Sequence, residues 1–173
     1  FLGEVAEVGS GVKALSVGDL VVSPFTTSCG SCFYCRKGLT CRCTGGQLFG
    51  WVQNGRGLEG AQAEYVRVPL ADSTLVRLPE GVDVEAALFL GDILATGFFC
   101  ADMAEAGPGG VYAVVGCGPV GLFAILGARE RGAERIFAID VVPERLELAK
   151  RFGARPIDAG RSDSREVVRE ATE

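Results

Sequence analysis

The sequence predicts an α/β protein in two parts, with short β-strands first and alternating strands and helices afterwards. Roughly the first 90 residues are rich in glycine and β-forming residues, and short strands at close spacing indicate a β-barrel or sandwich. The later alternation of strand and helix patterns predicts βαβ units and a parallel sheet. We therefore expect one domain at residues 1–92 and a second at residues 93–173.

In the first part, glycines and polar turns separate the predicted strands. Glu4–Val8 and Leu20–Val22 have the composition of short strands, and a Gly18-Asp19 turn precedes the second one. Ala61–Val68 also has the composition of a strand, and Pro69 follows it. We expect this segment to form a further strand of the same β domain.

In the second part, Asp92 precedes a run of apolar residues at helical spacing. Asp is a preferred residue at a helix N-cap, so the residues alone favour a capping role for Asp92. The expected strands are Val111–Val115, Arg135–Asp140 and Arg155–Ile157, and the expected helices are Pro119 to about Arg131 and Pro143–Phe152. A last amphipathic helix pattern runs into Glu173.

Composition excludes several classes of function. The chain has 173 residues, of which 48% are hydrophobic and 23% charged, the balance of a globular protein. No apolar run approaches the roughly 20 residues that span a membrane, and no signal peptide is recognisable at the start. The net charge of −5 argues against nucleic acid as a partner. We expect neither a membrane nor a nucleic-acid partner.

Five of the seven cysteines fall within fifteen residues, and the chain contains no histidine. Cys29, Cys32, Cys35 and Cys43 follow the spacing Cys-x2-Cys-x2-Cys-x7-Cys, with Cys41 as the spare. Crowded thiols favour metal ligation over a disulfide framework, and they indicate a reducing compartment such as the cytoplasm. Four soft sulfurs suit a closed, structural Zn²⁺ site.

Two alternatives to zinc stay open for this cluster. The first three cysteines also match an iron–sulfur run, whose fourth cysteine would stand where Leu39 is found. Unliganded thiols are the other alternative. The spacing favours zinc over both, in a lobe at about residues 29–43.

A predicted strand leads directly into a Gly-x-Gly-x-x-Gly turn and a helix, which is the pattern of a dinucleotide-binding site. Gly116 permits the tight turn, Gly118 allows the pyrophosphate to approach, and Gly121 allows close packing of helix on strand. Pro119 and Val120 complete the turn. The alternative is a glycine-rich turn in an α/β protein that binds no nucleotide.

Asp140 ends the next predicted strand, nineteen residues after Gly121. An acid at this place accepts a hydrogen bond from the adenosine ribose 2′-hydroxyl and repels a 2′-phosphate, so it favours NAD over NADP. Arg145 follows on the next helix, and we expect it near the adenosine end of the cofactor.

Taken together, these residues resemble the zinc-containing medium-chain dehydrogenase/reductase family of the alcohol dehydrogenase type. The match runs along nearly the whole chain: Phe1–Gly9 resembles the stretch after the family's Gly-His-Glu motif, and Val17–Val21, the four cysteines, Ala63–Val66 and Gly116–Gly121 follow in order. The resemblance implies a partial GroES-like catalytic domain followed by the first half of a Rossmann sheet. It also implies that the chain is a fragment.

The resemblance changes the expected role of Asp92. In this family, an early cysteine, the histidine of Gly-His-Glu and a third residue ahead of a Thr-Gly helix hold a catalytic zinc. Asp92 occupies that third position, where related enzymes have cysteine or aspartate. Aspartate there, with Leu48-Phe49-Gly50, is closest to the formaldehyde-dehydrogenase-like branch.

The activity implied is hydride transfer between a small alcohol and NAD, with zinc as Lewis acid and a homodimer or homotetramer as the assembly. The isolated fragment would be inactive. One alternative is a zinc-free quinone or enoyl reductase of the same superfamily, which the cysteine lobe disfavours. Another is a non-catalytic four-cysteine zinc module joined to a nucleotide-sensing domain.

Overall fold

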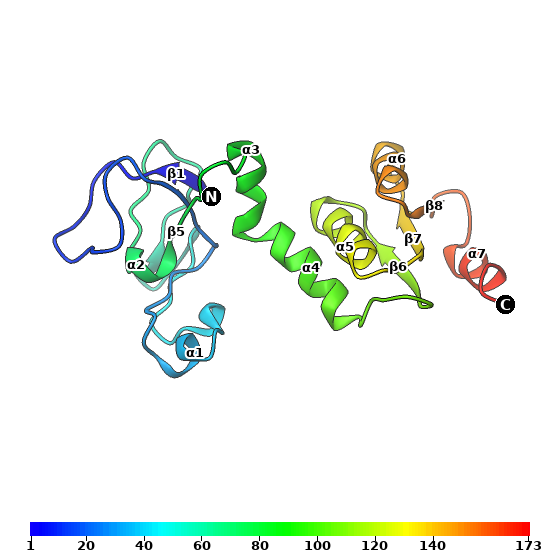
Figure 1. Ribbon diagram of the computed structural model, residues 1–173, viewed down its shortest axis with the longest axis horizontal. Coiled ribbons are helices and arrows are strands. Elements are labelled where there is room, and N and C mark those ends of the chain that lie inside the picture. The colour runs from blue at the N-terminus through cyan, green and yellow to red at the C-terminus, as the bar shows by residue number, and fades with distance from the viewer. The chain divides into compact units, whose positions relative to one another are not determined.

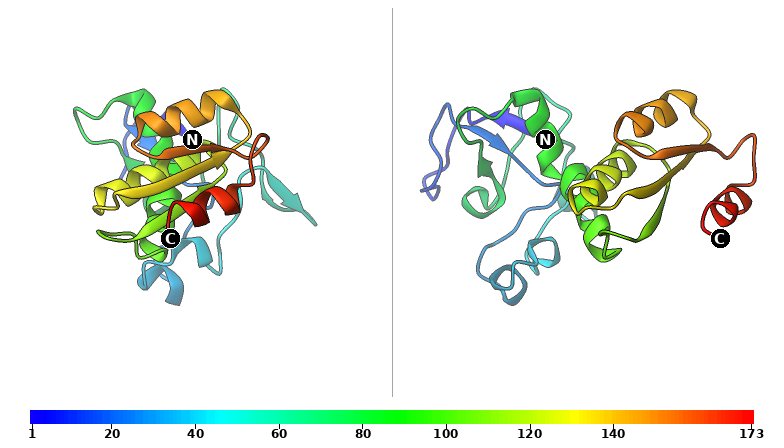
Figure 2. Two further views of the ribbon diagram at one scale, coloured as in Figure 1. Left: turned by 90° about the vertical axis from the view of Figure 1, so that its right-hand side faces the viewer. Right: turned by 45° about the vertical axis from the view of Figure 1, so that its right-hand side comes forward.

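The computed structural model describes the backbone of residues 1–173 and every side chain except that of Arg56. The chain divides into two compact units, Phe1–Asp92 and Ile93–Glu173, shown from three directions in Figures 1 and 2. The first carries the cysteine lobe and the second carries the glycine-rich turn.

A small antiparallel sheet forms the framework of the first unit. Its strands are β1 (Leu2–Glu4), β2 (Leu20–Val22) and β5 (Val76–Arg77), in the order β1-β2-β5. Leu2 is paired with Val22, and Val22 with Val76, so the beginning and end of the unit meet at β2. Val21 and Val22 are buried, and they hold the sheet against the rest of the unit.

Two of the predicted strands were placed wrongly. The first strand is Leu2–Glu4 rather than Glu4–Val8, because pairing with β2 stops after Val5, whose amide donates to the carbonyl of Asp19. Ala61–Val68 forms no strand. Its Tyr65 side chain stays 82% exposed, so no buried face stabilises an extended pairing there.

The first unit also contains a β-hairpin that was not predicted from the sequence, formed by β3 (Trp51–Gln53) and β4 (Arg56–Leu58). Asn54 and Gly55 connect the strands with φ angles of 53° and 70°. Positive φ at both turn residues is typical of the type I′ hairpin turn, for which Asn-Gly is the preferred dipeptide. The Asn-Gly pair was the signal that could have found this hairpin.

Short helices complete the first unit. They are α1 (Phe33–Arg36) and the 3-10 helix η1 (Thr40–Arg42) in the cysteine lobe, and then α2 (Ala71–Thr74), α3 (Val84–Ala87) and the 3-10 helix η2 (Leu88–Gly91). Asp83 caps α3 by accepting a hydrogen bond from the Ala86 amide at 2.8 Å. This end of the unit leads into Asp92.

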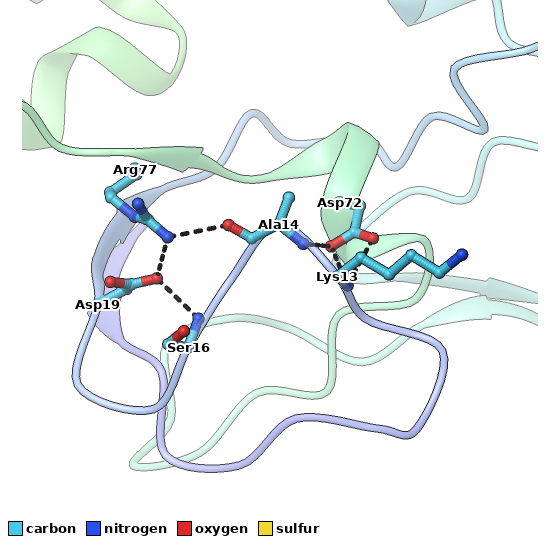
Figure 3. A network of polar contacts seen from close by, with 6 residues as sticks. All are labelled: Lys13, Ala14, Ser16, Asp19, Asp72 and Arg77. Carbon is cyan, nitrogen blue, oxygen red and sulfur yellow. Dashed lines mark hydrogen bonds and ion pairs between the residues drawn. The ribbon is translucent and has the colours of Figure 1, made fainter.

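A network of polar contacts fastens the long loop between β1 and β2 to α2 and β5 (Figure 3). The carboxylate of Asp72 accepts hydrogen bonds from the amides of Lys13 and Ala14, each at 2.9 Å. The Arg77 guanidinium donates to the carbonyl of Ala14 at 2.9 Å and to the carboxylate of Asp19 at 2.7 Å. Both connections join segments about sixty residues apart in the sequence.

The second unit has the predicted parallel sheet. Its elements are α4 (Ile93–Met103), β6 (Val111–Val115), α5 (Pro119–Glu130), β7 (Arg135–Asp140), α6 (Pro143–Arg151), β8 (Arg155–Asp158) and α7 (Ser164–Glu170). The strand order is β6-β7-β8, so the strands follow one another in space as they do in sequence. The three parallel strands end on the same edge, which carries the glycine turn after β6 and Asp140 as the last residue of β7.

The two faces of the sheet have separate cores, because side chains along β7 alternate between them. Ile136 and Ala138 pack with Leu122 and Ile125 of α5 on one face. Phe137 and Ile139 pack with residues of α7 on the other. Helices α4 and α5 also pack closely, since a Cβ added to Gly97 would clash with Phe123. Helix α5 is therefore held on two sides.

No single helix in the described chain is long and apolar enough to cross a membrane. The bent pair made of Val84–Gly91 and Ile93–Met103 reaches that length and composition only when its two parts are counted together.

Candidate functional site

The structure brings together the four cysteines that the spacing selected. The Sγ atoms of Cys29, Cys32, Cys35 and Cys43 all lie within 4.8 Å of one another. The Sγ atoms of Cys32 and Cys43 are 4.0 Å apart, close to the roughly 3.8 Å that tetrahedral Zn–S bonds of about 2.3 Å require. Each of these cysteines is free of a disulfide, and Cys41 is exposed outside the group.

The backbone of the lobe is shaped for this cluster. Gly30 and Gly38 turn the chain with φ angles of 70° and 77°, which glycine adopts without strain. The amide of Cys29 donates to the sulfur of Cys43 at 3.3 Å, and the amide of Cys32 donates to the sulfur of Cys29 at 3.4 Å. Such N–H···S bonds favour thiolates, which are the form that binds a metal.

The protonation of the cluster supports a cationic occupant. Hydrogen bonds from the backbone of Cys35 and Thr44 lower the pKa of Cys32 to about 6, and those from Ser31 lower the pKa of Cys29 to about 7. Burial and the neighbouring sulfurs raise the pKa of Cys35 to about 11. Four thiolates this close repel one another, so they coexist only around a cation. The donor set fits Zn²⁺.

Buried hydroxyl groups hold the base of the lobe, and the sequence analysis missed them. The amide of Ser28 donates to Oγ1 of Thr74 at 3.0 Å, and the amide of Gln47 donates to Oγ1 of Thr27 at 3.0 Å. Ser28 and Thr74 are almost fully buried, and Thr27 has no exposed surface. Isolated hydroxyl residues give no sequence signal, because their partners lie up to 46 residues away.

In the second unit, the glycine turn combines a left-handed backbone conformation with an open approach to its second glycine. Gly116 has a φ angle of 87°, and its amide donates to the carbonyl of Ile139 at 2.8 Å. Open space surrounds the position that a Cβ on Gly118 would take. Pro119 begins α5, so Val120 and Gly121 lie in the first turn, where helix amides have no acceptor within the helix.

Asp140 lies at the end of β7 with its side chain directed into this turn. Its Oδ2 accepts a hydrogen bond from the Cys117 amide at 2.7 Å, and its Oδ1 accepts from the amides of Val141 and Val142 at 2.7 and 2.9 Å. These amides hold the pKa of Asp140 below its usual value. Arg145, on α6, places its guanidinium 3.9 Å from Oδ2. The structure thus groups Asp140, Arg145 and the glycine turn.

Asp92 is exposed and separate from the cysteine cluster. It follows η2 directly and precedes Ile93, the first residue of α4. The preceding Gly91 packs closely against the backbone of Ser23, because a Cβ there would stand 2.5 Å from the Ser23 carbonyl oxygen. Asp92 is thereby fixed beside the end of β2.

An open hollow beside the β3–β4 hairpin is lined by Gln47, Trp51 and Asn54, among others. None of the residues predicted to bind zinc or the cofactor lines it. The hollow therefore adds nothing to the assignment of the site.

A four-cysteine lobe on a β domain, followed by a parallel sheet with a glycine turn, defines the class of zinc-binding dehydrogenases. The alcohol dehydrogenase GroES-like domain family matches residues 1–80, and the zinc-binding dehydrogenase family matches residues 119–173. The chain belongs to the zinc-containing medium-chain dehydrogenase/reductase family. Its partial GroES-like domain and partial Rossmann sheet agree with the predicted fold.

Individual relatives agree with this assignment. The chain is 51% identical to a medium chain reductase/dehydrogenase from an Acremonium species, covering 91% of the chain and 55% of the relative. It is 40% identical to an NADP-dependent isopropanol dehydrogenase from Thermoanaerobacter brockii, covering 90% and 44%. The solved alcohol dehydrogenase from Thermus sp. ATN1 superposes with a TM-score of 0.88 at 44% identity, covering 99% and 50%. The chain spans about half the length of these proteins.

Proposed function

We propose that the protein carrying this chain is a zinc-dependent alcohol dehydrogenase that transfers a hydride between a small alcohol and NAD, interconverting the alcohol with its aldehyde or ketone. The observation that carries this proposal is the grouping of Asp140 with the Gly116–Gly121 turn at one edge of a parallel sheet. Ligands of doubly wound sheets bind at this edge, outside the carboxyl ends of the strands. The family membership supports the same reading.

The residues of the turn would bind the cofactor pyrophosphate. The missing side chain of Gly118 leaves room for the phosphates to approach the backbone, and the first amides of α5 at Val120 and Gly121 point their partial positive charge toward them. Helix α5 is twelve residues long, so its dipole is fully developed. These groups bind and orient the cofactor without taking part in the redox step.

Asp140 would choose between the two nicotinamide cofactors. Its carboxylate can accept a hydrogen bond from a ribose hydroxyl. A 2′-phosphate would instead face the negative charge of a residue that is only 8% exposed. Arg145 stands close enough to offset part of that charge. The isopropanol dehydrogenase named above uses NADP, so cofactor choice varies among similar proteins and needs a direct measurement.

Asp92 is the proposed ligand of this chain to a catalytic zinc. The amide of Ser23 donates to the carbonyl of Phe1 at 2.9 Å, and Gly91 packs on the same Ser23 backbone. A Gly-His-Glu motif just before Phe1, which the resemblance implies, would therefore enter beside Asp92. When bound there, zinc supplies Lewis-acid stabilisation of the alkoxide, and NAD supplies the hydride acceptor.

The four cysteines would hold a second, structural zinc, since they leave no coordination position open. The substrate would be a small alcohol or carbonyl compound. The resemblance supports a homodimer or homotetramer as the assembly. The cysteine lobe separates this proposal from a zinc-free reductase of the same superfamily.

The test is turnover by the intact protein purified with its metal. We expect alcohol-dependent reduction of NAD, loss of activity on chelation, and two zinc ions per subunit by metal analysis. A protein that binds NAD and zinc but oxidises no alcohol from a panel of primary and secondary alcohols would support the nucleotide-sensing alternative. Activity unchanged after removal of all zinc would support a zinc-free reductase.

A further inference from the structure

Most of the acceptor positions of the Asp140 carboxylate are occupied by hydrogen bonds from the protein itself. It accepts hydrogen bonds from three backbone amides, those of Cys117, Val141 and Val142, at 2.7 to 2.9 Å. An ionised carboxylate offers about four acceptor positions. One position, on Oδ2, therefore stays available for a ribose hydroxyl, on the side where Arg145 lies.

The Cys117 amide belongs to the middle of the glycine turn, 23 residues from Asp140 in sequence. The turn has two attachments to β7: the Gly116 amide donates to the carbonyl of Ile139, and the Cys117 amide donates to the Asp140 side chain. The side chain of Cys117 has no exposed surface, so packing against the core also holds the turn in place. Without Asp140, the buried amide of Cys117 would lose its hydrogen-bond partner, which is unfavourable in the interior of the protein.

We infer that Asp140 is a positioning residue for the pyrophosphate-binding turn in addition to being a ribose acceptor: its carboxylate fixes the Cys117 peptide and thereby holds Gly116–Gly121 in the phosphate-binding conformation. This inference rests on the proposed cofactor site. Its consequence is that substitutions of Asp140 change phosphate binding and ribose recognition together. A substitution of Asp140 would then alter the affinity for both cofactors as well as the preference for NAD over NADP.

Two ligands separate the two roles. ADP carries both the pyrophosphate and the ribose hydroxyls, whereas 2′,3′-dideoxy-ADP carries the pyrophosphate but no hydroxyl that Asp140 could bind. Asp140→Asn has a single acceptor oxygen, which can serve either the Val141–Val142 amides or the Cys117 amide. Its NH2 group, placed at the other end, repels the remaining N–H.

Calorimetric titration of the intact protein decides between the roles. If Asp140 positions the turn, Asp140→Asn weakens the binding of both ligands, by about tenfold for 2′,3′-dideoxy-ADP and by more for ADP, which also loses its ribose contact. If Asp140 only accepts ribose hydroxyls, the affinity for 2′,3′-dideoxy-ADP stays at its wild-type value, and the inference is wrong. Asp158→Asn is the matched control. Asp158 ends the neighbouring strand, but its carboxylate accepts a hydrogen bond from the amide of Gly160 in the turn that follows its own strand.

A second measurement uses only the wild-type protein, so it does not depend on whether a variant folds. In the wild-type protein, the Cys117 amide should exchange slowly with solvent, and its NMR shift should change as Asp140 is protonated by acid. Fast exchange and a shift independent of pH would contradict the inference. Failure of the wild-type protein to bind ADP at all would instead overturn the proposed cofactor site, and the inference with it.

Discussion

Gly121 lies directly against Gly116, so closely that a Cβ on Gly121 would collide with the carbonyl oxygen of Gly116. No such obstacle surrounds Gly118. Two glycines of one motif are therefore required for different reasons: one for packing the first turn of α5 on its own loop, the other for access of a ligand.

This contrast predicts different results for two alanine variants. Gly121→Ala should destabilise the protein by about 1–3 kcal/mol through overpacking, and it should weaken NAD binding as the turn shifts. Gly118→Ala should fold with nearly wild-type stability, because its φ angle of −70° suits any residue, yet bind NAD poorly. Thermal unfolding and NAD titration of both variants test this. Equal stability of the two variants would contradict the packing argument.

The cysteine cluster predicts which thiols retain metal. Cys32→Ser should release the structural zinc, because it removes one of four converging sulfurs. Cys41→Ser is the matched control and should keep the metal, since Cys41 is exposed outside the cluster. Metal analysis gives the content, and X-ray absorption at the zinc edge should show four Zn–S contacts. A visible iron–sulfur chromophore in the purified protein would contradict the zinc assignment.

Asp92 is predicted to act through metal and not through the helix it precedes. Asn is also a preferred N-cap residue, so Asp92→Asn should leave α4 in place but weaken catalytic zinc binding and reduce kcat strongly, while Asp92→Cys should retain a metal ligand. The 173-residue chain alone should bind only the structural zinc and oxidise no alcohol. Wild-type zinc content and turnover in Asp92→Asn would return Asp92 to the role of a helix cap.

Acid is predicted to weaken the second unit through Asp140. Backbone amides, led by that of Cys117, hold the pKa of Asp140 below its unfolded value of about 3.9. Its contribution to stability is therefore complete above that value and is lost as pH falls through the lower, folded pKa. Urea unfolding at successive pH values should show a smaller loss of stability below about pH 4 in Asp140→Asn than in the wild type. Parallel acid curves would contradict this.

The sequence predicted best those elements whose signals are local. The strand Arg135–Asp140 was predicted with its observed bounds, because a buried parallel strand is a continuous apolar run. The four cysteines were identified by spacing alone, because one short loop supplies them all. Each of these features depends on residues close together in the chain.

Features that depend on distant partners could not be predicted. The bond from Cys117 to Asp140 joins residues with no common pattern, and the buried hydroxyls of Thr27 and Thr74 have ordinary neighbours in sequence. The strand predicted at Ala61–Val68 was wrong for a related reason: its composition is a local signal, but no neighbouring surface covers Tyr65. Burial, and not composition alone, decides whether such a segment pairs.

The pairing of Val22 with Val76 brings together the two ends of the chain segment that carries the cysteine lobe. Closing a loop of that length costs on the order of 3–4 kcal/mol in chain entropy, and the β2–β5 pairing, reinforced by the Arg77 and Asp72 contacts, opposes that cost without help from the metal. The cysteine lobe thus lies on an inserted segment whose closure does not depend on the cysteine cluster. During evolution such an insertion can lose its cysteines, shorten or change its surface while the framework that carries it keeps folding.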